Sequence, residues 1–262
     1  MNSVTVSIVT VAFNASSTIK ETIDSVLNQK DELVEYIIVD GGSRDGTLDI
    51  IQSYGNQIDK VISEPDKGIS DAFNKGIRKS SGDIICIVNS DDILYEGSIK
   101  AAQKFFSEDP ELDILFGDVI SFCNNMDDGF LVRADTDLTK IRYAFLLPHP
   151  GMFISRKAYE KYGDYSLDYK NAMDYDLVSR MYKGGARFKY ANRILAAFRE
   201  GGTSKNTLTR TIAEHIKIAK NNGAGVVELQ KYIAWIRIRR SSAPLLKALG
   251  IENALHKIVK GY

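Results

Sequence analysis

Two adjacent carboxylates end an apolar stretch in the first half of the chain. The segment CIVNSDD, from Cys86 to Asp92, reads as a core strand that leads directly into an amide, a hydroxyl and then two acids. Neighbouring carboxylates repel each other, so a chain that places them at the mouth of a buried strand needs positive charge to offset them. A divalent cation is the obvious candidate.

Three more polar clusters follow apolar stretches in the same way. They span residues 10–14, 40–46 and 64–68, and the fourth is the acidic segment at residues 89–92. In a parallel α/β sheet, ligands bind beyond the carboxyl ends of the strands, near the point where the strand order reverses. We therefore expect four loops to converge on one edge of a sheet and to form a binding site there.

The elements that must position these loops alternate between strands and helices, which favours right-handed βαβ crossovers and a mostly parallel sheet. Beyond residue 97 the pattern loosens, and residues 120–128 are typical of a hairpin or of an excursion of the chain. Thr47 is expected to cap its helix. The expected strands cover residues 4–12, 35–39, 61–63, 84–88 and 114–119, and the expected helices cover 19–27, 47–54, 69–79, 97–106, 174–181 and 206–221, with two or more in 226–262.

Taken in order, the loop motifs resemble those of a known family. TVAFN (10–14), DGGSRDGT (40–47), SEPDKGISDAFNKGI (63–77) and NSDD (89–92) are similar to the nucleotide-sugar-binding half of a family 2 glycosyltransferase, and MDYDLVSRM (173–181) is similar to that family's acceptor-side motif. The resemblance runs from about residue 4 to about residue 202.

The resemblance implies a GT-A fold, with a Rossmann-like, mostly parallel central sheet flanked by helices. We expect a catalytic domain over residues 1–205, with a nucleotide-sugar-binding half (1–95) and an acceptor-binding half (96–205). Residues 206–262 would form a C-terminal helical extension.

In similar enzymes the first loop and the aspartate after the second strand hold the base of a uridine or related nucleotide. The resemblance therefore implies that Thr10, Phe13 and Asp40 face the base, with Asn14 in the same donor-binding loop. An unpaired buried polar edge costs about 1–3 kcal/mol, so an aspartate acceptor suits a pyrimidine N–H. A second interpretation is open, in which Asp40 ends the strand by bonding its own turn.

The Asp-x-Asp motif of the family corresponds here to Asn89-Ser90-Asp91, so that an amide replaces the first carboxylate. The resemblance implies that Asp91 binds Mn²⁺ or Mg²⁺, hard cations that carboxylates hold together with substrate phosphate oxygens, and that Asn89 and Ser90 face the donor. Three roles are open for Asp92, which could reach the metal, bind the sugar or cap the helix that begins near Glu96.

The loop after the third strand lies over the donor in similar enzymes. Glu64 and Lys67 belong to it, and a lysine there would neutralise diphosphate charge; a solvated surface lysine is the alternative. Asp71 and Asn74 lie three residues apart on the following helix and so share a face. They either contact the sugar or ribose, or lock the loop to the helix.

By motif match, Asp174 is the catalytic base. Displacement at the anomeric carbon with inversion requires a group that takes the proton of the acceptor hydroxyl. The acidic residue that usually precedes this base is Met173 here. Asp176 would bind acceptor or support Arg180 at i+4. If Asp174 were only an N-cap, asparagine would replace it without loss of turnover.

Three further residues are assigned to the acceptor or to a closing loop. His149 lies in an HPG turn before an apolar strand, and a packed structural histidine is the alternative to a metal or acceptor role. Gly202 and Ser204 lie in a GGTS segment that resembles a loop closing over the donor in similar enzymes. Ordinary loop flexibility is the alternative explanation.

The composition excludes several protein classes. Thirty-four basic residues balance thirty-four acidic ones, so no nucleic acid or other polyanion is expected as a partner. Two cysteines, Cys86 and Cys123, fit a reducing cytosol. The N-terminal segment reads as a strand, not a signal peptide, and no stretch approaches the roughly 20 apolar residues of a spanning helix. We expect a cytoplasmic protein.

The last part of the chain is basic. Residues 226–262 carry seven Lys and Arg residues against Glu228 and Glu252, interleaved with Tyr232 and Trp235. Such a segment would lie on an anionic membrane surface, which would make the protein peripheral on the inner face of the membrane. The alternative is a helical appendage that packs on the catalytic domain or on a second subunit in a homo-oligomer.

The sequence therefore favours a hexosyl- or N-acetylhexosaminyltransferase. The expected donor is a nucleotide sugar, most simply a UDP-sugar, and the expected acceptor is a saccharide or lipid-linked saccharide of a bacterial surface polysaccharide. A sugar nucleotidyltransferase would need a Gly-rich basic loop directly after the first strand, and TVAFNASST has none. A non-catalytic sensor or scaffold is the third interpretation, because Asn89 and Met173 replace acids.

Overall fold

The computed structural model describes residues 3–201, 208–234 and 236. Its centre is a nine-stranded sheet in the order β3-β2-β1-β4-β8-β6-β9-β5, with β7 paired to β6. The strand order reverses next to β1, where β2 lies on one side and β4 on the other. This is the position at which an α/β sheet binds its ligand.

The first half of the sheet is parallel, and its strands are buried except for the edge strand β3. It contains β1 (Val6–Ala12), β2 (Val34–Asp40), β3 (Lys60–Ser63) and β4 (Ile84–Asn89). Ala12 pairs with Asp40, and Asp40 with Ser63, while Val11 pairs with Asn89. This register aligns the carboxyl ends of the four strands, so the loops that follow them start at one edge, as predicted.

The second half of the sheet is mixed, so the parallel character expected of the whole sheet is confined to β1–β4 and to the β6–β9 pair. β8 runs antiparallel to both β4 and β6, and β5 and β7 are also antiparallel to their partners. The bounds are β5 Ile93–Leu94, β6 Ile114–Phe122, β7 Phe130–Val132, β8 Phe153–Ser155 and β9 Phe188–Arg199.

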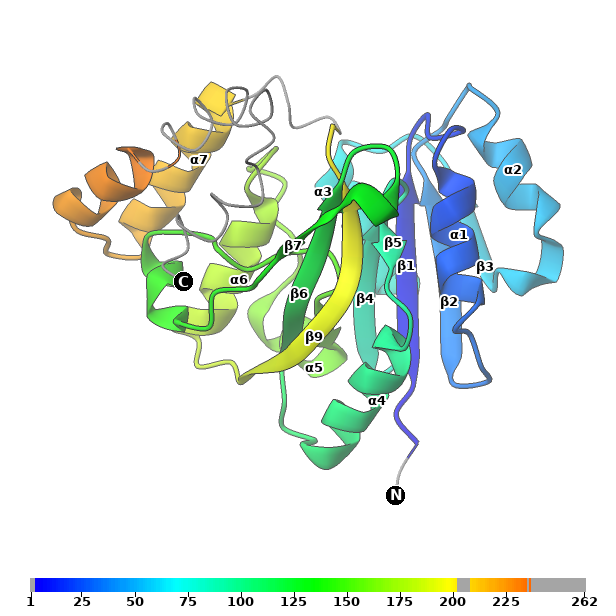
Figure 1. Ribbon diagram of the computed structural model, residues 1–262, viewed down its shortest axis with the longest axis horizontal. Helices are drawn as coiled ribbons and strands as arrows, with labels where there is room; N and C mark the ends of the chain where they lie inside the picture. The colour runs from blue at the N-terminus through cyan, green and yellow to red at the C-terminus, as the bar shows by residue number, and fades with distance from the viewer. Residues whose placement is uncertain (1–2, 202–207, 235, 237–262) are drawn as a thin grey trace.

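Helices cover both faces of the sheet (Figure 1). On one face pack α1 (Ile19–Leu27), α2 (Thr47–Ser53) and α4 (Ser98–Glu108), which contribute Ile23, Ile51 and Ile99 to a buried cluster. The other face carries α3 (Ile69–Lys79), α5 (Arg156–Tyr162) and α6 (Met173–Lys183). Single 3₁₀ turns occupy Gly55–Gln57, Met126–Asp128 and Leu138–Arg142.

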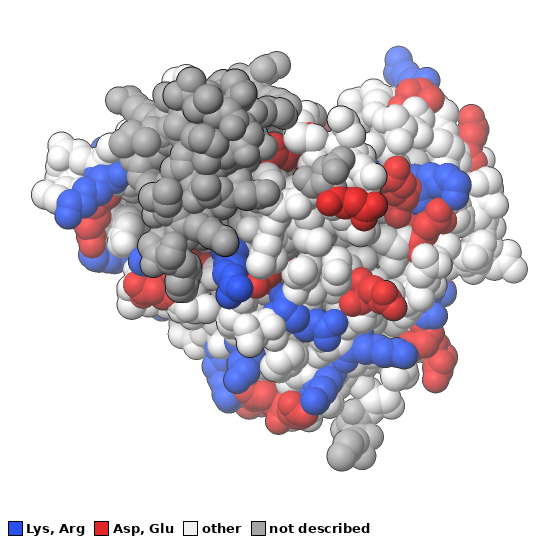
Figure 2. Space-filling view, viewed as in Figure 1, with Lys and Arg blue, Asp and Glu red and all other residues white. Residues whose placement is uncertain are grey.

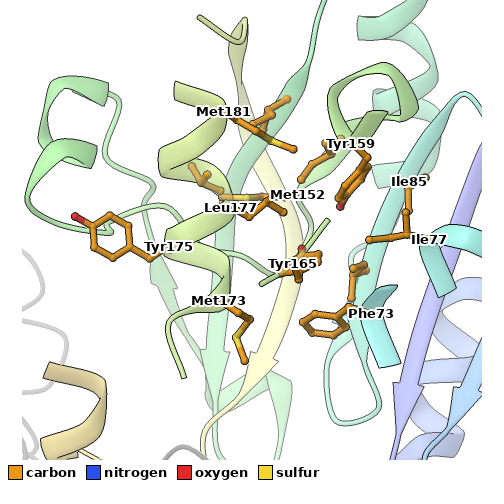
Figure 3. Close-up of a cluster of buried hydrophobic side chains, with 14 of the residues drawn as sticks. Phe73, Ile77, Ile85, Met152, Tyr159, Tyr165, Met173, Tyr175, Leu177 and Met181 are labelled. Carbon is orange, nitrogen blue, oxygen red and sulfur yellow. The ribbon is translucent and has the colours of Figure 1, made fainter. Parts of the chain in front are cut away.

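The second cluster is rich in aromatic and sulfur-containing side chains. Figure 3 shows Met173, Leu177 and Met181 of α6 on the side of the helix that faces Met152, Phe73, Tyr159 and Tyr165. Tyr175 points away from them, on the other side of the helix. Met173 is buried in this group. The residue before Asp174 therefore faces the hydrophobic core, which explains why it is apolar.

Several local predictions are confirmed. Helix α3 has the predicted bounds, and the polar segment after β6 forms a hairpin with β7. The capping prediction for Thr47 is wrong, because Gly46 is the N-cap of α2. The Thr47 hydroxyl instead accepts a hydrogen bond from Ala15 N at 2.7 Å and donates one to Asp45 Oδ1 at 2.5 Å, which ties the first loop to the second.

Helix α3 packs unusually close to the sheet at one residue. A Cβ atom added to Gly76 would lie 2.2 Å from Val9 Cγ1 on β1. Only glycine allows this approach, which brings the middle of α3 into close contact with the middle of β1.

The contact predicts the effect of Gly76→Ala. Overpacking a filled core costs about 1–3 kcal/mol, so we expect the free energy of unfolding in urea to fall by that amount. The double variant Val9→Ala/Gly76→Ala removes the colliding methyl and should recover part of the loss. Full stability of the single variant would contradict the packing seen here.

The C-terminal region begins with α7 (Leu208–Asn221), followed by a helical segment over residues 226–234. Helix α7 lies alongside α6 (Figure 1). Trp235 and residues 237–262, which hold most of the basic tail, are outside the described residues. Within the described part of the chain, no helix is long and apolar enough to span a bilayer. Acidic and basic side chains are interspersed on the face shown in Figure 2.

Candidate active site

The loops after β1, β2 and β3 touch one another around Gly41. A Cβ atom on Gly41 would lie 2.4 Å from Asp66 Oδ2 and 3.3 Å from the Phe13 ring. Phe13 is 64% exposed, which is unusual for a phenylalanine beside a sheet. The absence of a side chain on Gly41 therefore brings an exposed aromatic ring and a carboxylate together at the sheet edge.

Two residues predicted to bind the donor hold the first loop in place. Thr10 is fully buried, and its hydroxyl lies 3.1 Å from the Tyr36 hydroxyl inside the sheet. Asn14 adopts a left-handed backbone (φ 50°), and its Oδ1 accepts a hydrogen bond from Arg44 N at 2.9 Å. Both residues shape the edge of the site, and the Phe13 ring between them is exposed.

Asp40 is also fully buried at the end of β2. Its carboxylate accepts hydrogen bonds from Gly42 N at 3.2 Å, from Ser43 N and from the Ser63 hydroxyl at 2.7 Å. These contacts agree with the interpretation in which Asp40 ends the strand by bonding its own turn. A contact between Asp40 and a nucleotide base stays a prediction.

Two carboxylates crowd the carboxyl end of β4. Asp92 is 2% exposed, and burial together with the Asp91 charge raises its pKa to about 7. Burial likewise raises the pKa of Asp91, which is half-buried. Asp92 accepts hydrogen bonds from Asn89 Nδ2 at 2.9 Å and from Arg199 N at 3.2 Å. Ser90 N donates to Val11 O at 3.2 Å.

The capping role considered for Asp92 is excluded, because α4 begins at Ser98 and its N-cap is Gly97. Asp92 instead ties the segment that follows β4 to the end of β9. This leaves Asp91 as the carboxylate that is only half-buried at the site.

The donor set at this position suits a divalent cation. No hydrogen-bond donor among the described residues reaches the buried Asn89 Oδ1, and an orphaned amide oxygen is a hard ligand of the kind that Mg²⁺ and Mn²⁺ take. Asn89 Oδ1 and the Asp91 carboxylate would supply two ligands. The described part of the chain has no group of three or more His, Cys, Asp or Glu side chains placed to hold a metal.

The third loop is fixed by charge pairs at the start of α3. Asp71 accepts a hydrogen bond from Lys67 N at 3.0 Å, which lowers the pKa of its carboxyl. Lys75 pairs with Glu64 at 2.9 Å and with Asp71 at 3.4 Å. These contacts leave the side chain of Lys67 exposed at the loop.

Asn74 locks α3 to a distant segment. Its Nδ2 donates to Tyr165 O at 2.8 Å, and its Oδ1 accepts from Tyr165 N at 2.9 Å. Of the two interpretations considered for this residue, the locking role agrees with these contacts, because both ends of the buried amide are occupied.

Asp174 lies in the first turn of α6. It is half-buried, and its Oδ1 accepts a hydrogen bond from Tyr175 N at 2.8 Å. Burial raises the pKa of its carboxyl, partly opposed by that hydrogen bond and by His215 nearby. The N-cap of α6 is Ala172, so the N-cap alternative for Asp174 is not observed. Asp176 pairs with Arg180 Nε at 2.9 Å, the predicted i+4 contact.

His149 is packed within the aromatic cluster. Its Nε2 lies 2.8 Å from the Tyr165 hydroxyl, and its ring stacks on Phe73 at 5.8 Å between centroids. Burial lowers its pKa to about 4, so the imidazole is neutral at physiological pH. These contacts agree with the packed structural alternative. Gly202 and Ser204 lie outside the described residues.

Two residues at the site were not predicted from the sequence. Arg199 ends β9, donates its backbone N–H to Asp92, and places its guanidinium 4.6 Å from the Phe122 ring centroid. Glu214 of α7 binds the backbone just before Asp174. No local motif marks either residue, since each acts through contacts with a segment far away in the chain.

Comparison with known proteins identifies the family. The model of glycosyl transferase family 2 matches residues 7–163. The chain is 28% identical over 207 residues to a PGL/p-HBAD biosynthesis glycosyltransferase of Mycobacterium tuberculosis, covering 77% of this chain and 79% of the relative. It is 30% identical over 196 residues to a chondroitin synthase of Pasteurella multocida, covering 72% of this chain and 20% of that protein.

Solved structures share the fold. The TarS 1-349 structure from S. aureus in complex with UDP-GlcNAc superposes with a TM-score of 0.65 at 17% identity, covering 83% of this chain and 66% of that one. The mannosyltransferase PcManGT from Pyrobaculum calidifontis, in complex with GDP-Man and Mn²⁺, gives a TM-score of 0.63 at 16% identity over 99% of this chain and 83% of that one. Together with the family match, these likenesses show that the chain has the GT-A fold, belongs to glycosyl transferase family 2 and is a glycosyltransferase.

Proposed function

We propose that this enzyme transfers a sugar from a UDP-sugar to an acceptor hydroxyl with inversion, assisted by Mn²⁺ or Mg²⁺. The observation that carries the proposal is the buried cluster after β4. Its carboxylates have raised pKa values, and the orphaned Asn89 Oδ1 lies beside them. A diphosphate that arrives with its cation would satisfy both features.

The loops around this cluster suit the remaining parts of a nucleotide sugar. The exposed Phe13 ring offers a stacking face for a base, next to Asp40 at the end of β2. Lys67 is free to neutralise diphosphate charge, because its loop is already held by Asp71 through the backbone. The cation would act as a Lewis acid on the leaving diphosphate.

The acceptor side is assigned to Asp174 as general base. A carboxyl group whose pKa is raised by burial is better matched to proton abstraction from a hydroxyl than an exposed aspartate. The named relatives act in PGL/p-HBAD biosynthesis and as a chondroitin synthase. We infer a saccharide or lipid-linked saccharide acceptor and a role in bacterial surface polysaccharide synthesis.

Membrane association and formation of a homo-oligomer are also proposals, as is the identity of the acceptor. The basic residues of 226–262 would bring the site to a lipid-linked acceptor. Pelleting with anionic vesicles at low salt tests this idea, and absence of binding would remove it.

A thermal-shift panel of UDP, GDP, dTDP and CMP, each with and without Mn²⁺, tests the donor site. A ligand at 100 times its Kd stabilises the folded state by about 2.7 kcal/mol, which is a shift of several degrees for a chain of this length. We expect UDP to raise the melting temperature when Mn²⁺ is present, and UDP-sugars then to turn over.

Two other results would change the assignment. A metal-dependent shift with GDP instead of UDP would mean that the donor is a GDP-sugar, and the proposed cation site would be retained. UDP binding without turnover of any UDP-sugar would favour a non-catalytic sensor or scaffold. The argument for that alternative is that Asn89 replaces the first acid of the metal-binding motif. No shift with any nucleotide would contradict the donor site.

A further inference from the structure

Helix α7 binds the polypeptide that leads into the proposed catalytic base. The carboxylate of Glu214 accepts three backbone hydrogen bonds: Oε1 from Lys170 N at 3.1 Å, and Oε2 from Asn171 N at 2.9 Å and Ala172 N at 3.0 Å. A fourth contact joins the same segments, because Asn171 Nδ2 donates to Thr211 Oγ1 at 3.0 Å. One turn of α7 therefore holds three consecutive residues that end two positions before Asp174.

This contact completes the N-terminus of α6. The N-cap residue of that helix is Ala172, which has no side-chain oxygen with which to cap the helix. The first N–H groups of a helix need acceptors, and negative charge is favourable at that end of the helix dipole. Glu214 places its negative charge at that end and accepts from the N-cap amide, Ala172 N, although it lies on a helix more than 40 residues further along the chain.

The next residue of α7, His215, contacts the residue that follows Asp174. The His215 ring packs against the Tyr175 ring at 5.1 Å between centroids, and its Nδ1 lies 3.0 Å from the Tyr232 hydroxyl. Asp174 thus lies between a backbone segment held by Glu214 and an aromatic ring held by His215. Its position depends on α7 from both directions.

We propose that Glu214 is a positioning residue for Asp174, and that α7 is a working part of the catalytic site instead of an appendage to it. The inference rests on the proposed function, in which Asp174 is the general base. The carboxylate fixes the first turn of α6 and so fixes the distance from Asp174 to the acceptor hydroxyl. A misplacement of about 1 Å in such a group lowers the rate by about 100-fold.

The test compares Glu214→Ala and Glu214→Gln with a matched control, Glu228→Ala. Glu228 is also a carboxylate of the C-terminal region that accepts a backbone hydrogen bond, from Gly225 N at 2.8 Å, and it pairs with Arg142. Glu228 therefore reports the general effect of losing an acidic side chain in this region. We expect Glu214→Ala to lower kcat by about 10- to 100-fold with the KM for the donor unchanged.

The glutamine variant separates positioning from folding. Its amide oxygen can still accept from the α6 N-terminus although its NH₂ group cannot, so we expect kcat between those of the wild type and Glu214→Ala. The UDP-dependent thermal shift should persist in both variants, which shows that the donor half is folded. Equal losses of kcat in Glu214→Ala and Glu228→Ala would overturn the proposal.

Amide hydrogen exchange tests the same inference without any assay of transfer. In Glu214→Ala, the amides of residues 170–174 should exchange at least 10-fold faster, while those of α3 keep their wild-type rates. Unchanged exchange at residues 170–174 would overturn the positioning role. If the wild type transfers no sugar but the exchange result holds, the proposed function fails and the anchoring of α6 by Glu214 stands.

Discussion

Replacing Asp174 with asparagine is expected to lower kcat by about 10²- to 10⁴-fold, the contribution typical of a general base. Asparagine keeps the size of the side chain and an oxygen that can accept from Tyr175 N, so the start of α6 should stay folded. It cannot take a proton from the acceptor hydroxyl. The measurement is kcat with saturating donor, alongside the thermal shift produced by UDP and Mn²⁺, which should be unchanged.

Asp176→Asn is the matched control, because it removes a neighbouring acid of the same helix turn that pairs with Arg180. We expect it to lower kcat far less than Asp174→Asn does.

The pH profile gives a second readout of the same base. Burial raises the pKa of Asp174 above that of an ordinary aspartate, so kcat should fall as pH is lowered, beginning above the range in which exposed aspartates titrate. Wild-type turnover in Asp174→Asn would contradict the base assignment.

Replacing Asp91 with asparagine should remove most of the metal dependence of the enzyme. The carboxylate is the only anionic ligand that we assign to the cation from the protein, and a cation contributes several kcal/mol to stabilisation of a leaving diphosphate. We therefore expect kcat/KM to fall by about 100-fold or more. We also expect Mn²⁺ to lose its effect on the UDP thermal shift.

Asn89→Asp tests the same site in the opposite direction. It restores the commoner acidic pattern, so Mn²⁺ should bind more tightly. The protein without metal should be less stable, because a third carboxylate would then crowd Asp91 and Asp92. A Mn²⁺-dependent UDP shift of wild-type size in Asp91→Asn would place the cation elsewhere.

The first half of the fold follows closely from the sequence. Strands β1, β2 and β4 are runs of apolar residues buried on both faces, and α3 is amphipathic with polar residues on one side, so periodicity defines their extents. Because parallel strands end at one sheet edge, the convergence of four loops could be predicted without coordinates.

The second half is less readable because its strands lack a regular pattern. β9 was not predicted, although at 12 residues it is the longest strand of the described chain. Its burial does not alternate, Asn192 takes a left-handed backbone (φ 51°), and the pairing with β6 shifts register near Phe116 and Asp118. A bulge of this kind breaks the two-residue period on which strand prediction depends.

Side chains whose partners are close in sequence could be interpreted from the sequence, and side chains with distant partners could not. The motif around Asp91 could be picked out from the sequence because its residues are neighbours in the chain, and its role in metal binding stays a prediction. The partners of Asn74 and Glu214 lie 91 and about 43 residues away, so only tertiary structure reveals that the first locks α3 and the second binds the backbone before Asp174.

A crystal structure of the enzyme with UDP and Mn²⁺, recorded at a wavelength where manganese scatters anomalously, tests directly whether Asp91 holds the cation beside the nucleotide. We expect an anomalous peak about 2.1 Å from an Asp91 carboxylate oxygen and next to the UDP diphosphate, with the uracil ring against Phe13. UDP bound at these loops without a manganese peak at Asp91, or manganese bound at another group of ligands, would contradict it.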